Sequence, residues 1–239
     1  QISEAKGKLI VESIDTLLAL SDEDLRKDFP LKVYQTGSGT QTNMNCNEVV
    51  AHQAAKLNPE LEILPNDDVN KGQSSNDIFP TAMNIVAADA VAKLEESAQH
   101  LIDELKKKQE KYWRVVKIGR THLQDATPLT FGQEVSGWVS ALEHDLEYLK
   151  QLDGTLLELA MGGTAVGTGL NAAPGFADVI AEKVGKVYGH EFTAKSNKFY
   201  GLSHHSNLNV VHGAMKTLAD DLMKIANDVR FLASGPRAG

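Results

Sequence analysis

The sequence of 239 residues lacks several features that would place it in a particular class of protein. Its single cysteine, Cys46, excludes a disulfide within the chain, which is typical of a reducing compartment. No run of about 18 consecutive apolar residues occurs, so no membrane span is expected, and no signal peptide is visible. A net charge of −8 argues against a nucleic-acid surface or a polybasic membrane patch.

Motifs for nucleotides and metals are missing as well. No glycine-rich loop ends in Gly-Lys-Ser/Thr, so there is no Walker phosphate loop. Residues 167–172 satisfy the dinucleotide pattern G-x-G-x-x-A, but they are expected to follow a helix, outside any βαβ unit. His204, His205 and His212 lack an H-E-x-x-H arrangement, so helix-surface or core histidines are favoured over a metal site.

A hydrophobic content of 42% is ample for a packed core, in one large domain or two. Three long helices are predicted. They cover residues 76–112, 130–162 and 203–233, approximately. The first is apolar nearly all round between residues 82 and 91, which predicts burial on every side. The second begins with the capping-box pattern of Thr130 and Gln133.

The third helix carries a heptad seam over its whole length. Its apolar residues alternate spacings of three and four: Leu208, Val211, Met215, Leu218, Leu222, Ile225, Val229 and Leu232. Such a seam is typical of an elongated bundle. Three helices alone leave faces uncovered, so further helices or other subunits are expected to complete it. Asp220 and Asp221 are interpreted as a solvated face.

The amino-terminal third is predicted to be more irregular. A helix is expected over residues 1–20, an extended segment over 31–34, a loop over 35–45, and a second helix near residues 47–54. Residues 57–74 are expected to be loop.

Residues 66–80 form the mouth of the first long helix. Ser74, Ser75, Asn76 and Asp77 are all good N-cap residues, and Pro80 is expected in the first helical turn. Unpaired N–H groups and the positive end of the helix dipole favour an anion there. An alternative is that these residues only cap the helix.

Four stretches are rich in small hydrogen-bond donors, and each is expected in a loop beside a helix end. They are residues 37–40, residues 66–67 with 74–76, residues 119–130, and residues 162–171. His122 is the best single catalytic candidate, because imidazole titrates near neutrality. A histidine that caps the following helix is the alternative interpretation.

The stretches taken together resemble class II fumarase (fumarate hydratase), of the fumarase/aspartase superfamily, over essentially the whole chain. The motifs that carry the resemblance lie at residues 37–45, 71–77, 119–122, 162–171 and 234–237. Aspartase (aspartate ammonia-lyase), the close competitor, typically has Thr in place of Ser75 and Gln in place of His122. It also differs at Ser38 and at Gln41–Thr42, and the sequence sides with fumarase at each position.

The resemblance implies an all-α fold, an elongated long-helix bundle with part of a small, mainly helical N-terminal domain. Residues 1–74 would belong to that domain and residues 75–239 to the bundle. The resemblance also implies a homotetramer whose site combines motifs from three subunits, with neither metal nor organic cofactor. A cytoplasmic enzyme of the tricarboxylic acid cycle is expected, and a mitochondrial form stays open.

By the same resemblance, His122 would be catalytic, orienting or activating water for reversible hydration of fumarate to (S)-malate. The residues implied to bind this dicarboxylate are Ser38, Gly39, Thr40, Ser74, Ser75, Asn76 and Thr121. A non-catalytic helical oligomerisation module is the rival hypothesis from another class.

Two departures from the family pattern have consequences. Fumarases commonly read His-Pro-Asn-Asp at a secondary anion site, whereas this chain reads Leu64, Pro65, Asn66 and Asp67. Leucine donates no side-chain hydrogen bond, so weaker anion binding is expected there. The family also continues into a mobile loop that carries a presumed catalytic serine, so residues 1–239 alone are expected to be inactive, truncated at both ends relative to the family.

Overall fold

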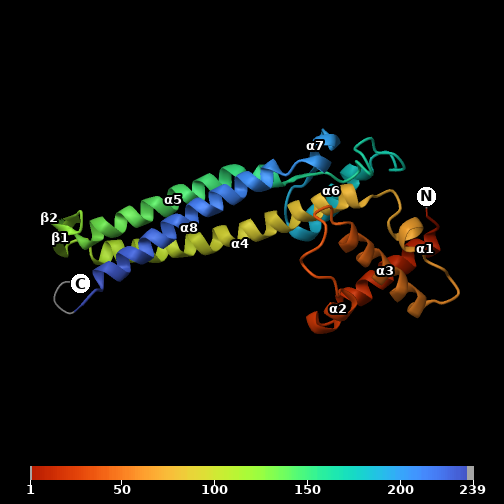
Figure 1. Ribbon diagram of the computed structural model, residues 1–239, viewed down its shortest axis with the longest axis horizontal. Helices are drawn as coiled ribbons and strands as arrows, with labels where there is room; N and C mark the ends of the chain where they lie inside the picture. Colours follow the sequence, from red (N-terminus) through yellow and green to blue (C-terminus); the bar gives the residue numbers. More distant parts are fainter. Residues whose placement is uncertain (1, 236–239) are drawn as a thin grey trace. The chain divides into compact units, whose positions relative to one another are not determined.

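The computed structural model describes residues 2–235, which divide into two compact units. Unit 1 comprises Gln1–Ile85 and Leu157–His205, and unit 2 comprises Val86–Leu156 and Ser206–Gly239. Helices make up most of both units (Figure 1). The described strands form two sheets of two strands each. The predicted all-α class is confirmed. The predicted boundary between residues 74 and 75 differs from this division and stays a prediction.

Unit 1 begins with three helices, α1 (Glu4–Leu18), α2 (Asp22–Asp28) and α3 (Thr40–Leu57). The hydroxyls of Ser3 and Ser21 cap α1 and α2, because each accepts a backbone N–H from the first turn. α1 packs against α3, and a small apolar core of Leu9, Ala51, Ala54 and Ile63 lies in this part of the unit.

Two segments of unit 1 that were predicted as loop are partly helical. α3 begins at Thr40, inside the expected loop 35–45, because Gly39 adopts φ +74° and serves as its N-cap. A short π-helical turn, η1 (Pro65–Val69), interrupts the expected loop 57–74. Proline at the first position of η1 costs no hydrogen bond, since that N–H has no helical partner.

The first long helix, α4, spans Ser75–Lys111, close to the predicted range. Pro80 is its sixth residue, so the prediction of a first-turn proline was wrong. Because proline has no N–H, the carbonyl of Asn76 loses its helical partner.

Burial along the early part of α4 is one-sided, which corrects the prediction of burial on every side. Thr81, Asn84 and Ala88 are buried, whereas Ala82 is exposed and Val86 has 65% of its surface exposed. The apolar residues of this segment therefore leave one face uncovered within a single chain.

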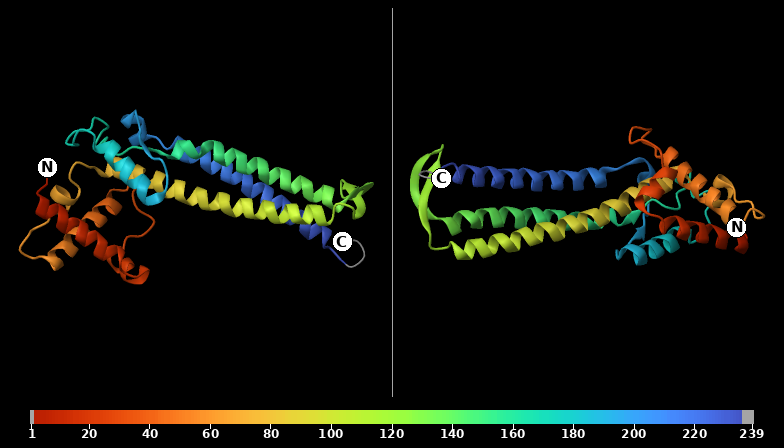
Figure 2. Two further views of the ribbon diagram at one scale, coloured as in Figure 1. Left: turned by 180° about the vertical axis from the view of Figure 1, so that it is seen from behind. Right: turned by 90° about the horizontal axis from the view of Figure 1, so that it is seen from below.

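Unit 2 is built from α4 beyond Ile85, α5 (Phe131–Leu156) and α8 (Ser206–Leu232). These helices run side by side (Figures 1 and 2), and their core consists of Ala98, Ile102, Val135, Trp138, Val139, Leu142, Leu146, Leu149 and Leu218. The capping box of α5 is confirmed, because Thr130 Oγ1 accepts from Gln133 N–H and Gln133 Oε1 accepts from Thr130 N–H. α5 ends at Leu156, earlier than predicted.

The heptad seam of α8 is only half covered. Val211 and Leu218 are buried, whereas Met215, Leu222 and Val229 are 39%, 37% and 49% exposed. One row of the seam packs within the unit and the other remains an exposed apolar row.

A β-hairpin replaces the loop that was predicted between α4 and α5. β1 (Val116–Thr121) pairs antiparallel with β2 (Gln124–Thr130), and a bulge lies between Ile118 and Arg120. A side chain at Gly119 would place its Cβ 2.5 Å from the carbonyl oxygen of Thr127, so the bulge requires glycine.

The remainder of unit 1 contains β3 (Glu158–Leu159), α6 (Phe176–Tyr188), β4 (Thr193–Ala194) and α7 (Lys198–Ser203). β3 and β4 pair in parallel, so a miniature βαβ unit does surround residues 167–172, contrary to expectation. The dinucleotide interpretation still fails, because α6 begins only at Phe176 and each strand has two residues. Within residues 2–235, no helix has the length and apolar character needed to cross a membrane.

Candidate active site

The first turn of α4 is closed by reciprocal hydrogen bonds. Ser74 Oγ accepts from the N–H of Asn76 at 3.2 Å, and Asp77 Oδ1 accepts from the N–H of Ser74 at 2.9 Å. This arrangement resembles a capping box with aspartate in the third helical position. Ser74 and Asp77 therefore cap the helix, which leaves Ser75 and Asn76 available for other contacts.

Asp77 also binds the glycine-rich stretch far along the chain. Its Oδ2 accepts from the N–H of Gly162 at 3.0 Å and from the N–H of Thr164 at 2.8 Å. The neighbouring Asn76 donates from Nδ2 to the carbonyl oxygen of Ala165 at 2.6 Å. In the sequence, Asp77 stands out only as a possible N-cap within the motif at residues 71–77. The available signal was a carboxylate directly after the neutral residues 74–76.

Asn43 of α3, within the motif at residues 37–45, joins this motif to the start of α4. Its Nδ2 donates to Ser75 Oγ at 2.9 Å and to Asn70 Oδ1 at 3.2 Å. Asn43 is buried, so these bonds are shielded from water. Because Ser75 Oγ accepts from Asn43, its own hydroxyl proton remains free to donate to a ligand.

A chain of hydroxyl groups connects Thr36, Ser38 and Thr40. Thr36 Oγ1 donates to Gln41 Oε1 at 2.6 Å, and Ser38 Oγ lies 3.1 Å from Thr36 Oγ1 and 3.3 Å from Thr40 Oγ1. Since Gln41 Oε1 only accepts, donation runs from Thr40 through Ser38 to Thr36. The two longer bonds are weak, and a bound carboxylate would replace them at small cost.

Gly39 brings this loop against the start of α4. A Cβ on Gly39 would lie 2.1 Å from the ring of Phe79, and its φ of +74° suits glycine. In the structure, the absence of a side chain at Gly39 allows the loop that carries Ser38 to pack closely on Phe79 of α4.

Ser38 and Asn76 line one cavity of about 440 Å³ in unit 1, together with Ala165 of the glycine-rich stretch. His205 also lines it, although the sequence favours a surface or core histidine at this position. No Lys, Arg, Asp or Glu is among the described lining residues, so neutral groups and one imidazole surround the cavity.

Thr121 and His122 belong to unit 2 and lie at the tip of the hairpin. His122 and Leu123 form the two-residue turn, with φ of +51° and +62°, and both are exposed. Such a pair of positive values is typical of a type I′ turn. The alternative that His122 caps α5 is wrong, because Thr130 provides that cap.

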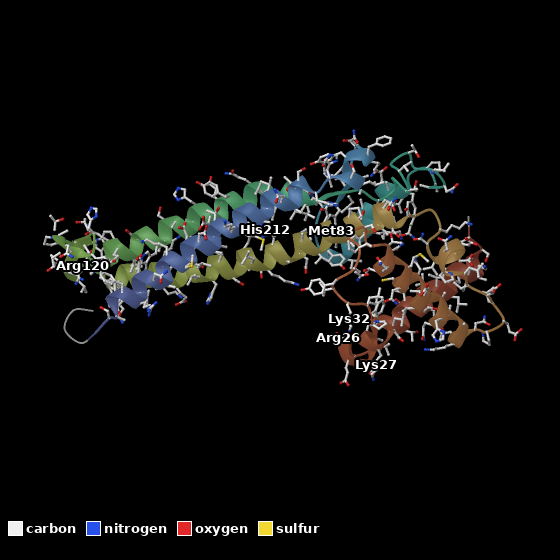
Figure 3. All side chains as sticks on the ribbon, viewed as in Figure 1. Arg26, Lys27, Lys32, Met83, Arg120 and His212 are labelled. Carbon is white, nitrogen blue, oxygen red and sulfur yellow. The ribbon has the colours of Figure 1, made fainter. Side chains whose placement is uncertain are left out.

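The hairpin is held by charged side chains. The Arg120 guanidinium lies 5.4 Å from the ring centre of Phe231 on α8, and its Nε is 3.3 Å from Asp125 Oδ1. Figure 3 labels Arg120 in the hairpin. Lys117 of β1 pairs with Glu134 of α5. These contacts fix the base of the turn that carries His122.

The altered secondary anion motif forms the start of η1. Leu64 is the N-cap, and its N–H donates to Asp68 Oδ2 at 2.9 Å. The pKa of Asp68 is lowered mainly by that bond and next by the Lys6 ammonium, whose Nζ lies 2.6 Å from Asp68 Oδ2. Asn66 and Asp67, with Lys71 among others, line a cavity of about 700 Å³ in unit 1.

Two pairs of carboxyl groups lie within the helices of unit 2. Burial, and then the charge of Asp221, raise the pKa of Asp145 to about 6. Asp145 is 2% exposed, and its Oδ2 has no hydrogen-bond partner among the described residues. Asp221 was predicted to be solvated; it is half-buried and faces Asp145. Burial, and then Asp153, raise the pKa of Glu95 to about 7.

Metal ligands do not gather in the described part of the chain, where no group of three or more His, Cys, Asp or Glu could hold an ion. His212 lies exposed on α8, as labelled in Figure 3. His204 Nδ1 lies 2.8 Å from Ser203 Oγ. Pro236 and Arg237, from the motif at 234–237, lie outside the described residues.

The profile of a lyase family matches residues 1–239, and the chain therefore belongs to this lyase family. Within it, the chain is 53% identical to a class II fumarate hydratase of Listeria monocytogenes, covering 100% of the chain and 54% of that protein. It is 51% identical to the class II fumarate hydratase of Bacillus subtilis, covering 98% of the chain and 52% of that protein. The predicted resemblance to class II fumarase is confirmed.

Solved structures agree with this assignment. A class II fumarase from Schistosoma mansoni superposes with a TM-score of 0.90 at 41% identity, covering 100% of the chain and 53% of that protein. A fumarate lyase/delta crystallin from Brucella melitensis, described as bound to cobalt, gives 0.88 at 34% identity, covering 100% and 52%. The chain spans about half the length of the curated relatives it matches.

Proposed function

We propose that the complete protein containing this chain is a class II fumarate hydratase, which adds water to fumarate in the anti sense to give (S)-malate, reversibly. The relatives that bear this name support the proposal. We place the enzyme in the tricarboxylic acid cycle, in the cytoplasm, as a homotetramer without a metal or organic cofactor.

The chemistry needs a site that stabilises a carboxylate as it gains negative charge. In the malate direction a proton leaves carbon, and charge moves onto the adjacent carboxylate. Neutral donors in a dry cavity stabilise this charge more in the transition state than in the ground state. Ser38, Thr40, Ser75 and Asn76 would supply such donors, and the amino-terminal end of α4 would add its dipole.

His122 would orient the water and exchange a proton with it. Thr121 beside it would donate to the substrate carboxylate. The proposal takes His122 and the donors of unit 1 from different subunits of the tetramer, as the resemblance implies. Each subunit would then contribute to more than one site.

The single observation that carries the proposal is the junction at the first turn of α4. Asp77 and Asn76 bind the glycine-rich stretch there, and Ser38 of the first donor-rich stretch lines one cavity with Asn76 and Ala165. Three of the four donor-rich stretches therefore meet at this point. A helix start that needed only a cap would require Ser74 and Asp77 and no partner from the glycine-rich stretch.

The experiment uses the complete protein and follows the ultraviolet absorbance of fumarate after addition of malate, with aspartate in parallel. Fumarate formed from malate alone supports the proposal. Fumarate formed from aspartate alone supports an aspartate ammonia-lyase, and turnover of neither substrate refutes both.

A non-catalytic oligomerisation module is the second candidate, favoured by the exposed row of Met215, Leu222 and Val229 on α8. It predicts a stable oligomer with no turnover of either substrate. An oligomer that hydrates fumarate refutes it, since the row then serves assembly of an enzyme.

A further inference from the structure

The carboxylate of Asp77 occupies an unusual position within unit 1. It has no exposed surface, and it accepts three backbone N–H groups, from Ser74, Gly162 and Thr164. No Lys, Arg or His within residues 2–235 forms an ion pair with it. Burial lowers the pKa of the nearby Lys198, and the charges of Asp178 and Asp77 only partly oppose that shift. Burying an ionised carboxylate costs free energy unless hydrogen-bond donors compensate for the lost water. The three N–H groups therefore allow Asp77 to be buried in its charged form.

The glycine-rich stretch adopts a conformation that it would not adopt by itself. Gly162 has φ +90° and Thr164 has φ +56°, and a left-handed threonine is rare because its side chain is branched at Cβ. Residues 162 and 164 direct their N–H groups onto one oxygen, in the manner of an anion-binding nest. Here the anion is the protein's own side chain.

The stretch held in this way forms part of a cavity wall. Ala165 follows Thr164 directly, and its carbonyl oxygen accepts from Asn76 Nδ2. Ala165 and Val166 line the cavity of about 440 Å³ with Ser38 and Asn76. A shift of residues 162–165 would therefore move both the wall and the amide of Asn76.

We propose that Asp77 is a positioning residue, which clasps residues 162–164 to the first turn of α4 and so fixes the donors of Ser75 and Asn76. The proposal rests on the proposed function, because these donors are assigned to the substrate carboxylate. Asp77 touches neither substrate nor water in this account. Its negative charge is offset by the three N–H groups and by the helix dipole, so it repels a dicarboxylate little.

The test variant is Asp77→Asn in the complete enzyme. An amide offers one accepting oxygen instead of two, so at least one of the three N–H groups loses its acceptor. Amide hydrogen exchange should accelerate at least tenfold at one or more of Ser74, Gly162 and Thr164. The kcat for fumarate should fall about 10- to 100-fold, more than KM rises, because positioned donors act chiefly in the transition state.

Two further variants separate positioning from folding. Asp145→Asn neutralises a similarly buried carboxyl group in unit 2, whose Oδ2 has no hydrogen-bond partner among the described residues, and it should leave kcat unchanged. Asp77→Glu keeps the charge but displaces it by one methylene, so it should fold and lose less activity than Asp77→Asn. If Asp77→Asn fails to fold, amide hydrogen exchange and kcat are measured on Asp77→Glu instead.

Each outcome decides the matter. Faster exchange together with a lower kcat supports the proposal, and the pKa values of the pH–rate profile should stay unchanged because Asp77 transfers no proton. Unchanged exchange, or faster exchange with kcat within twofold of the parent enzyme, overturns it. A parent enzyme without turnover of fumarate refutes the proposed function instead, and with it the need for positioning.

Discussion

Each unit is stabilised internally by a different kind of interaction. In unit 2, long helices bury a continuous apolar core that includes Leu142 and Leu149, both without exposed surface. In unit 1 the buried groups at the candidate site are polar, and Asn43 and Asp77 connect segments that lie far apart in the sequence. Apolar burial is non-directional and gives stability, whereas hydrogen bonds fix donor positions to a few tenths of an ångström. The long helices of unit 2 are therefore suited to be a scaffold, whereas the polar contacts of unit 1 are suited to position donors.

The largest expected effect is on the stability of the scaffold. Leu142→Ala should lower the free energy of unfolding of unit 2 by about 3–4 kcal/mol, because a fully buried leucine leaves a cavity. Native-state hydrogen exchange of α5 amides measures this change. Leu18→Ala, at a residue 73% exposed, should cost less than about 0.5 kcal/mol. A large loss of kcat with unchanged stability in Leu142→Ala would break the comparison.

A comparably large effect on activity is expected at the hairpin tip. His122→Asn in the complete enzyme should lower kcat by roughly 100-fold or more, the usual scale for an acid–base group. Stability should change little, because His122 is exposed. Steady-state kinetics with fumarate measures the change, and Leu123→Ala, at an equally exposed neighbour, serves as the control. Near-parental turnover of His122→Asn would reduce this residue to a structural role.

A smaller effect concerns the carboxyl pair of Asp145 on α5 and Asp221 on α8. The pKa of Asp145 is raised from 3.8 to about 6 in the folded state, so folded Asp145 holds its proton more tightly than unfolded Asp145. Its contribution to stability is therefore complete below about pH 4 and lost as the pH rises through 6.

Asp145→Asn should remove this loss and stabilise unit 2 by about 1–3 kcal/mol at pH 7.5. Urea unfolding between pH 4 and pH 8 measures it, with the exposed Asp220→Asn as control. Equal pH dependence in the parent and in Asp145→Asn would contradict the assignment.

The smallest effect is expected at the altered anion motif of unit 1. Leu64→His adds a side-chain donor two residues before Asn66, which lines the cavity of about 700 Å³. It should tighten binding of succinate about tenfold, the value of one hydrogen bond to a charged group. Calorimetry in a His122→Asn background measures it, with Leu64→Phe as the control for bulk. The kcat of Leu64→His in the parent background should be unchanged. No gain in affinity would show that this position does not limit anion binding.

Much of the fold follows from local patterns in the sequence. The range of α4, the capping box of α5 and the packed row of α8 all depend on spacing within one helix, so periodicity and cap chemistry predict them. The family resemblance at residues 37–45, 71–77, 119–122 and 162–171 is equally local and was confirmed.

What the sequence missed depends on contacts between distant segments. Asp77 reads as a cap because its three donors lie in two segments separated by more than eighty residues. The facing of Asp145 and Asp221 depends on how α5 packs on α8. The exposed row of α8 and the one-sided burial of α4 depend on which other helices pack against them. The spacing of apolar residues within one helix does not specify those partners.

The turn at His122 and Leu123 has a consequence for how the chain folds. Type I′ turns form readily when Asn-Gly occupies the two central positions, because both need positive φ. His-Leu gives no such local preference, so the hairpin should not nucleate by itself. We expect β1 and β2 to pair only after α4 and α5 have docked, which would give φ-values near zero for Arg120 and Asp125 and high values for Leu142 and Leu146. The imidazole would then be among the last parts of unit 2 to reach its final position.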